Sequence, residues 1–196
     1  MYARHCLRLA ASRACHCPTT ALLTLSRRFA SELPPRPTTS TEAREALAQG
    51  TRDLLNGSMA AALKSFERAL NLGEATADIY YNKGVCEYSL GLTDKAISSW
   101  EQSLALDSSR ADVHANIGNA YYLNKRDSAS ALSHMKRAAE LAPEDAEIQF
   151  NLGCLCESGD DLKAAISAYD RAAQLGLEKA KTHLRNAMAK QMKRQL

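Results

Sequence analysis

A repeat of about 34 residues constrains the fold of this chain more than any other sequence feature. Glycines recur at positions 50, 84, 118 and 153, so successive copies are separated by 34, 34 and 35 residues. Each copy continues with an alanine, a large side chain four residues later and a small one after three more: Ala62, Phe66, Ala69; Ala96, Trp100, Ser103; Ala131, Met135, Ala138; Ala165, Tyr169, Ala172. A period in this range is typical of stacked structural repeats.

The spacing inside each copy predicts two amphipathic helices. In the first copy Ala62, Phe66, Ala69 and Leu70 fall at i, i+4, i+7 and i+8, which is one face of an α-helix. Turn-forming residues separate the helices of a copy, at 56–57, 91–94 and 159–161. One hairpin cannot bury its apolar face alone, so we expect stacked hairpins in which large side chains fill the space between neighbours.

The repeats resemble the tetratricopeptide repeat family over residues 43–179. The resemblance rests on these residues: Ile117, Gly118, Tyr121, Ala131, Ala138 and Pro143 in the third copy; Leu152, Gly153, Ala165, Tyr169 and Ala172 in the fourth; Gly84, Ala96 and Trp100 in the second. The first copy departs from the pattern with Asp53 where a tyrosine is usual, and the third has one extra residue, which we place in its hairpin turn at 125–130.

The resemblance implies an all-α, right-handed superhelical solenoid of about four helix hairpins, with repeats at 43–76, 77–110, 111–145 and 146–179. Residues 180–196 then form a basic helix that caps the array, as repeat arrays require. We expect Leu184, Met188 and Met192 to form the buried stripe of this helix, since they lie at i, i+4 and i+8.

The N-terminal residues differ in composition from the repeats. Residues 1–31 contain five arginines and no acidic residue, and they end on Arg27-Arg28-Phe29-Ala30-Ser31. This composition is typical of a mitochondrial targeting presequence, although a basic tail that is never cleaved is an alternative. Residues 32–42, rich in proline and hydroxyl residues, are expected to be a linker. The pattern at 27–31 resembles a matrix-processing site, so we expect a matrix protein. No apolar run is long enough to span a membrane, so we expect at most peripheral membrane contact.

Charge is distributed unevenly along the chain. The net charge is +3, residues 1–31 and 180–196 each carry +5, and residues 32–179 therefore carry −7. Nucleic-acid binding usually requires a basic surface, so an acidic repeat region makes it an unfavoured function. Any RNA contact would use the C-terminal cations, such as Lys190, Lys193 and Arg194.

Catalytic and cofactor motifs are not found in the sequence. The glycines form no phosphate-binding loop, and His114, His134 and His183 lie on separate segments without nearby ligands at metal-binding spacing. Cys86, Cys154 and Cys156 have no paired spacing, and we expect them to fill the core. The sequence therefore predicts a protein that is not an enzyme, with no catalytic residues, metal site or cofactor.

The resemblance also implies a binding surface for a protein or peptide, in the concave groove lined by the first helix of each repeat. Asn82, Asn116 and Asn151 each lie two residues before a repeat glycine. Amide side chains at a constant period can hydrogen-bond both the N–H and C=O groups of an extended peptide. An alternative is that they stabilise neighbouring helices. The residues expected beside them are Tyr81, Val85, Asn119 and Phe150.

A second column of equivalent positions is acidic and consists of Asp78, Asp112 and Glu147. It has two interpretations. The carboxylates could form an acidic rim that attracts a basic partner. They could instead cap the helices, because each lies near an expected helix start.

These observations predict an interaction module, a mitochondrial adaptor or assembly factor that binds a peptide or subunit in its groove. The alternative is a mitochondrial RNA- or ribosome-associated factor that contacts RNA through residues 180–196.

Overall fold

The structure is a computed structural model that describes residues 41–195. The predicted presequence and residues 32–40 of the predicted linker lie outside the described residues. The last two linker residues, 41 and 42, belong to the first described helix. The described residues form two compact units, 41–120 and 121–195, and each unit is described by itself.

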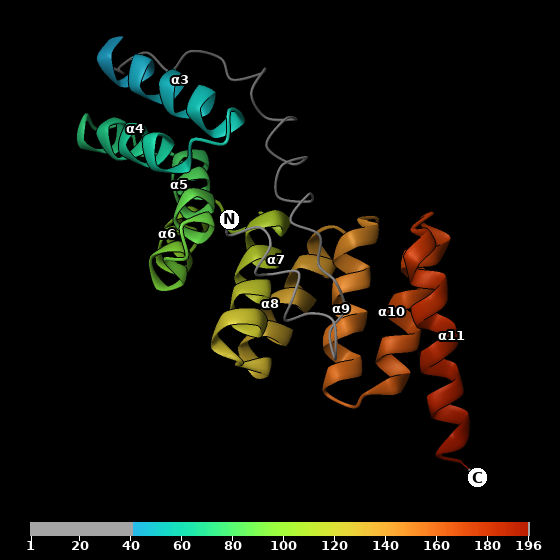
Figure 1. The fold of residues 1–196 in the computed structure, drawn as a ribbon. Coiled ribbons are helices and arrows are strands. Elements are labelled where there is room, and N and C mark those ends of the chain that lie inside the picture. Colours follow the sequence, from blue (N-terminus) through green and yellow to red (C-terminus); the bar gives the residue numbers. More distant parts are fainter. Residues whose placement is uncertain (1–40, 196) are drawn as a thin grey trace. The chain divides into compact units, whose positions relative to one another are not determined.

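The first unit contains five helices: α3 (Thr41–Leu55), α4 (Met59–Asn71), α5 (Ala77–Ser89), α6 (Thr93–Leu106) and α7 (Ala111–Ala120). Helices α3 and α4 pair with each other, as do α5 and α6, and α4 also packs against α5 (Figure 1). Helix α7 packs against α6. This arrangement is the succession of helix hairpins that the sequence period predicts.

The second unit begins with the short π-helix η1 (Tyr121–Lys125), followed by α8 (Ser128–Leu141), α9 (Ala146–Ser158), α10 (Leu162–Gln174) and α11 (Glu178–Lys193). Helix α9 packs against α8 and α10, and α10 packs against α11 (Figure 1). All regular secondary structure in residues 41–195 is helical.

In the first, second and fourth repeats, the glycine packs against the large side chain of the same hairpin. Phe66, Trp100, Met135 and Tyr169 are all buried. A Cβ atom added to Gly84 would lie 2.5 Å from Nε1 of Trp100, and one added to Gly153 would lie 2.6 Å from the Tyr169 ring. The large residue therefore needs the glycine of its own hairpin, in addition to the space between hairpins that the sequence predicts.

The hairpin turns form where the sequence predicts them. Gly57 and Gly91 have φ values of 77° and 79°, which a residue without Cβ adopts easily. In the fourth hairpin the residue with positive φ is Asp160, at 68°, rather than the adjacent glycine. Aspartate tolerates this conformation better than most residues.

The extra residue of the third repeat is absorbed in a different place from the one predicted. The chain forms a π-helix over Tyr121–Lys125, whose turn holds more residues than an α-helical turn. The insertion therefore lies several residues before the turn at 125–130 where it was predicted. A helix can take up one extra residue within its own last turn.

The C-terminal helix is present, but its buried face is not the one predicted. Ala180 and Ala187 are fully buried and Leu184 packs at the edge of the same cluster. Met188 and Met192 are 48 % and 64 % exposed. The predicted stripe of three residues was therefore wrong at its two methionines, because small alanines allow α11 to approach its neighbours closely.

Candidate binding surface

The predicted groove residues all lie on the first helices of the repeats. Helix α5 carries Asp78, Tyr81, Asn82 and Val85; α7 carries Asp112, Asn116 and Asn119; α9 carries Glu147, Phe150 and Asn151. The first seven belong to the unit 41–120 and the last three to the unit 121–195.

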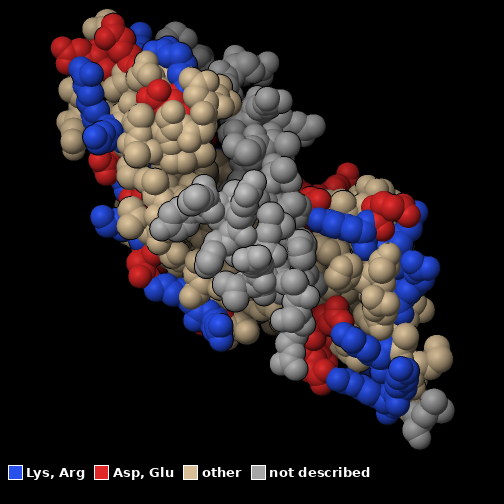
Figure 2. Space-filling view, in the orientation of Figure 1, with Lys and Arg blue, Asp and Glu red and all other residues tan. Residues whose placement is uncertain are grey.

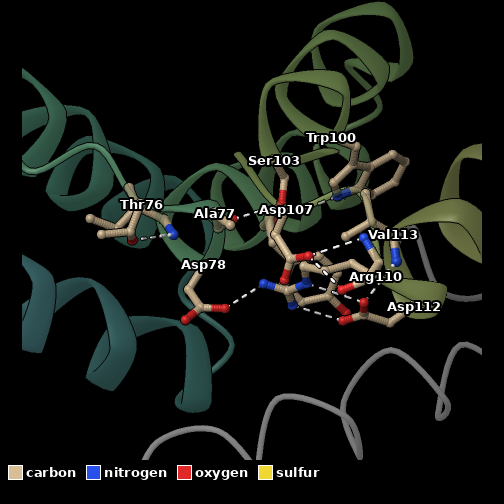
Figure 3. Close-up of polar contacts among 12 residues, drawn as sticks. Thr76, Ala77, Asp78, Trp100, Ser103, Asp107, Arg110, Asp112 and Val113 are labelled. Atoms are coloured by element: carbon tan, nitrogen blue, oxygen red, sulfur yellow. Dashed lines mark hydrogen bonds and ion pairs between the residues drawn. The ribbon is translucent and has the colours of Figure 1, made fainter. Parts of the chain in front are cut away.

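Arg110 joins α5 to α7 through the acidic column (Figure 3). Its guanidinium forms an ion pair with Asp78 and another with Asp112, where Nη2 lies 2.8 Å from Oδ2. The same group lies 4.7 Å from the centre of the Tyr81 ring. Burial alone would lower the pKa of Arg110, but the two carboxylates hold it above its ordinary value. Arg110 therefore stays charged and offsets one of the two negative charges in this part of the acidic column.

Lys179 makes the equivalent contacts between α9 and α11. Its Nζ lies 2.6 Å from Oε2 of Glu147 and 4.4 Å from the centre of the Phe150 ring. In both places the aromatic residue follows the acid by three positions and the cation follows it by 32. The two sites are copies of one arrangement that ties successive first helices together.

Neither interpretation of the acidic column predicted these ion pairs. The N-caps of α5 and α9 are Thr76 and Asp145, whose side chains accept backbone N–H groups. Of the three column residues, Asp112 does accept a backbone hydrogen bond, from Val113 at 2.9 Å. The carboxylates of Asp78 and Glu147 are instead used between helices.

The predicted apolar neighbours of the asparagines are largely buried. Tyr81 is 4 % exposed, and its hydroxyl accepts a hydrogen bond from Nδ2 of Asn116 at 3.5 Å. Burial is the main cause that raises the pKa of Tyr81 to about 12. Val85 is also buried, and Phe150 packs against Tyr169 and His183. The half-buried asparagines 82, 116, 119 and 151 are therefore more accessible to a ligand than these neighbours.

A buried polar cluster between α5 and α6 was missed by the sequence analysis. Glu87 is 2 % exposed and pairs with Nζ of Lys83 at 2.5 Å. The hydroxyl of Ser99 donates to the same carboxylate at 2.6 Å. The i, i+4 spacing of Lys83 and Glu87 indicates a helical ion pair, but its burial depends on α6.

Two of the three cysteines that were expected to fill the core, Cys86 and Cys156, behave as core residues. Cys86 and Cys156 are buried free thiols. Burial, with a smaller contribution from the charge of Glu87, raises the pKa of Cys86 to about 12, so this thiol is protonated near neutral pH.

The described residues contain no group of three or more His, Cys, Asp or Glu side chains that could hold a metal ion. Among residues 41–195 no helix combines the length and the apolar character that crossing a membrane requires.

Cations gather on the C-terminal half of α11, and acidic residues lie beside them (Figure 2). Lys190 forms an ion pair with Glu157, and Arg194 forms one with Asp160. Glu157 also accepts a hydrogen bond from the Tyr169 hydroxyl at 2.9 Å. Two of the three cations that suggested RNA binding are therefore used to hold α11 against the preceding repeat.

Comparison with protein families gives two matches in this chain. A model described as TPR repeat matches residues 86–125, and one described as tetratricopeptide repeat matches residues 120–180. Comparison with the curated proteins gives no match.

Solved structures resemble the fold at low sequence identity. MamA 41-end from Desulfovibrio magneticus RS-1 has a TM-score of 0.66 and 19 % identity, covering 78 % of this chain and 96 % of its own. YrrB, a TPR protein with an unusual peptide-binding site, has a TM-score of 0.64 and 19 % identity, and the match covers 74 % of each chain. The first TPR of Spaghetti (RPAP3), bound to an HSP90 peptide, has a TM-score of 0.56 and 21 % identity. The match covers 60 % of this chain and 94 % of the Spaghetti domain.

The helix pairs, their glycine contacts and these matches identify the chain as a tetratricopeptide repeat protein. The predicted family and the all-α solenoid fold are thereby confirmed. The class is one of protein-interaction domains, and the likeness to the solved structures concerns the fold alone.

Proposed function

We propose that this protein is a non-enzymatic adaptor or assembly factor of mitochondria, and that it binds a peptide or protein subunit on the first helices of its repeats. The observation that carries the proposal is the column of half-buried amides, Asn82, Asn116 and Asn151, on α5, α7 and α9. Amides can satisfy both the donors and the acceptors of a bound backbone.

Two of the similar structures support a peptide as ligand. YrrB has an unusual peptide-binding site, and the Spaghetti domain was solved with an HSP90 peptide. A repeat array offers an extended surface that suits such ligands. The absence of catalytic motifs in the sequence is consistent with binding rather than chemistry.

The mitochondrial part of the proposal is supported by the composition of residues 1–31, which lie outside the described residues. Import of the full chain into isolated mitochondria, followed by N-terminal sequencing of the protected product, tests it. We expect cleavage near Arg28 and recovery in the matrix fraction. A full-length product that stays accessible to external protease would contradict it.

The binding surface is tested by replacing the three column asparagines with alanine in the full chain. A matched control replaces three exposed asparagines away from the column, Asn56, Asn71 and Asn186. Each protein is crosslinked inside mitochondria, and the partners are identified by mass spectrometry. Circular dichroism checks that both variants are folded.

We expect a small set of partners to be lost from the column variant and kept by the control. Partners that stay with a folded column variant would show that the asparagines act within the fold, and would refute their role in binding. RNA binding is not carried forward as a second function, because Glu157 and Asp160 already neutralise Lys190 and Arg194.

A further inference from the structure

Helix α11 buries less of its surface than the helices beside it. Its buried residues are Ala180 and Ala187, whereas α10 buries five residues that include the large side chain of Tyr169. Leu184 is half-buried at the edge of the same apolar cluster. Hydrophobic stabilisation follows the apolar area that is removed from water, so these few contacts hold α11 weakly. Of the helices α8 to α11, α11 is the one that apolar packing secures least.

Long side chains of opposite charge connect α11 to α9 and to the turn that follows α9. The partners are 32, 33 and 34 residues apart in the sequence. The three pairs are Lys179 with Glu147, Lys190 with Glu157, and Arg194 with Asp160. Because the separation is nearly constant, α9 and α11 run side by side in parallel (Figure 1). Between the ion pairs, the ring of His183 meets the ring of Phe150 edge-on at 5.0 Å.

The ion pairs lie at the surface of the molecule. The side chains of Lys190 and Arg194 are 58 % and 53 % exposed. Exposed ion pairs contribute little to stability, and dissolved salt screens them. Contacts of this kind favour a local opening in which α11 leaves its neighbours while α9 and α10 stay folded.

The face that α11 covers is acidic. Glu147, Glu157 and Asp160 all belong to it, and α9 contains no Lys or Arg. Burial would raise the pKa of Glu157, but Lys190 and the hydroxyl of Tyr169 hold it below its ordinary value. Release of α11 takes this cation away, and the carboxylate is then left beside apolar surface without a counter-charge.

We propose that α11 is a displaceable cap, and that a basic helix of a partner protein replaces it on this face. Charge complementarity selects the occupant, because the face presents three carboxylates that cations of α11 satisfy. The occupant carries small residues seven positions apart, as Ala180 and Ala187 are, since these allow a close approach to α10. The rings of Phe150 and Tyr169, which contact His183 of the cap, then pack against the new helix. This surface uses none of the column asparagines and goes beyond the proposed function.

Exchange of backbone amide hydrogens, measured by mass spectrometry on the full chain, tests whether α11 opens by itself. The test variant is Lys190→Glu with Arg194→Glu, which reverses the cation in two of the three pairs. The control is Arg185→Glu with Lys193→Glu, which makes the same change of charge at exposed residues of the same helix. Each protein is measured at about 0.1 M and about 1 M sodium chloride, between which the screening length falls from about 10 Å to about 3 Å.

We expect the amides of α11 in the wild type to exchange about tenfold faster at the higher salt concentration, because salt weakens three ion pairs at once. The amides of α9 and α10 should not change. The test variant should show the faster exchange already at the lower salt concentration, and the control should behave as the wild type does. Protection of α9 and α10 in each variant shows that these helices are folded.

A fluorescent peptide of residues 176–195, which is the chain's own cap, serves as the probe for a basic helix. Anisotropy measures its binding to the full chain. We expect the test variant to bind it at least about tenfold more tightly than the wild type and the control, in which the tethered cap competes at a high effective concentration. The same peptide with Lys190→Glu and Arg194→Glu should not bind.

Three results would overturn the proposal. Exchange of α11 that is as slow in the test variant as in the control would show that the ion pairs do not hold the cap. Release of α11 without binding of the peptide would show that the uncovered face does not accept a basic helix. Equal affinity of the peptide for the wild type and the test variant would place its binding site elsewhere on the chain. None of these results concerns the asparagine column, so each would leave the proposed function standing.

Discussion

Replacement of Gly84 by alanine sets helix propensity against packing at the contact between α5 and α6. The new Cβ would lie 2.5 Å from Nε1 and 2.6 Å from Cδ1 of Trp100, whereas ordinary contacts begin at 3.4 Å. The indole must therefore move by about 1 Å. It is buried, and its Nε1 donates to the carbonyl of Tyr81 at 3.2 Å, so the movement also breaks this hydrogen bond.

Three contributions decide the sign of the effect. Alanine in place of glycine stabilises a helix interior by about 1 kcal/mol. Overpacking of the core costs about 1 to 3 kcal/mol. A buried N–H donor left without its acceptor costs about 1 to 3 kcal/mol more. We therefore expect Gly84→Ala to lower the free energy of unfolding by about 3 kcal/mol.

Urea denaturation of the full chain measures this free energy. Trp100 is the single tryptophan of the sequence, so its fluorescence reports directly on the packed site, while circular dichroism follows the helices. Gly159→Ala is the matched control, because a Cβ there would make only ordinary contacts, the closest at 3.5 Å from the carbonyl of Leu155. The control should be neutral or slightly stabilising. If Gly84→Ala were as stable as the control, the packing argument would be refuted.

Three further substitutions test contacts made by the tertiary structure. Glu87→Ala should lower the free energy of unfolding by about 3 kcal/mol, because it leaves the partly buried Lys83 without its partner. Arg110→Ala should lower the free energy of unfolding by about 2 kcal/mol in the same assay. This loss is smaller than that for Glu87→Ala because Asp78, the partner left behind, is more exposed than Lys83. Because burial raises the pKa of Cys86 to about 12, the unfolded chain loses this proton first, and stability should fall by up to about 1.4 kcal/mol per pH unit above about pH 9. Cys86→Ala should remove that part of the alkaline slope.

Each of these predictions has a contrary result. A Glu87→Ala protein as stable as the wild type would mean that solvent satisfies the ammonium group of Lys83 when its partner is removed. An Arg110→Ala variant that unfolds no earlier would mean that α5 and α7 are held by apolar packing alone. An alkaline slope that is unchanged in Cys86→Ala would assign the titration to other groups.

The hairpins, their turns and the identity of the buried large residues could be predicted because local sequence encodes them. Ala62 and Phe66 lie one helical turn apart, and this pair and the repeat glycine recur about every 34 residues. Each repeat buries the same face, so one period specifies the whole array. The amide and acidic columns of the candidate site could be predicted in the same way, because their residues occupy equivalent positions in successive repeats.

What surrounds those columns was decided by the tertiary structure. Arg110 and Lys179 are far in sequence from Asp78 and Glu147, and only the packing of successive first helices brings them together. The exposed face of α11 was equally hidden, since methionines at helical spacing fit a buried stripe until Ala180 and Ala187 are seen to occupy it. A repeat pattern fixes which positions are equivalent, but the charge and exposure of each position depend on the neighbouring helix that packs beside it.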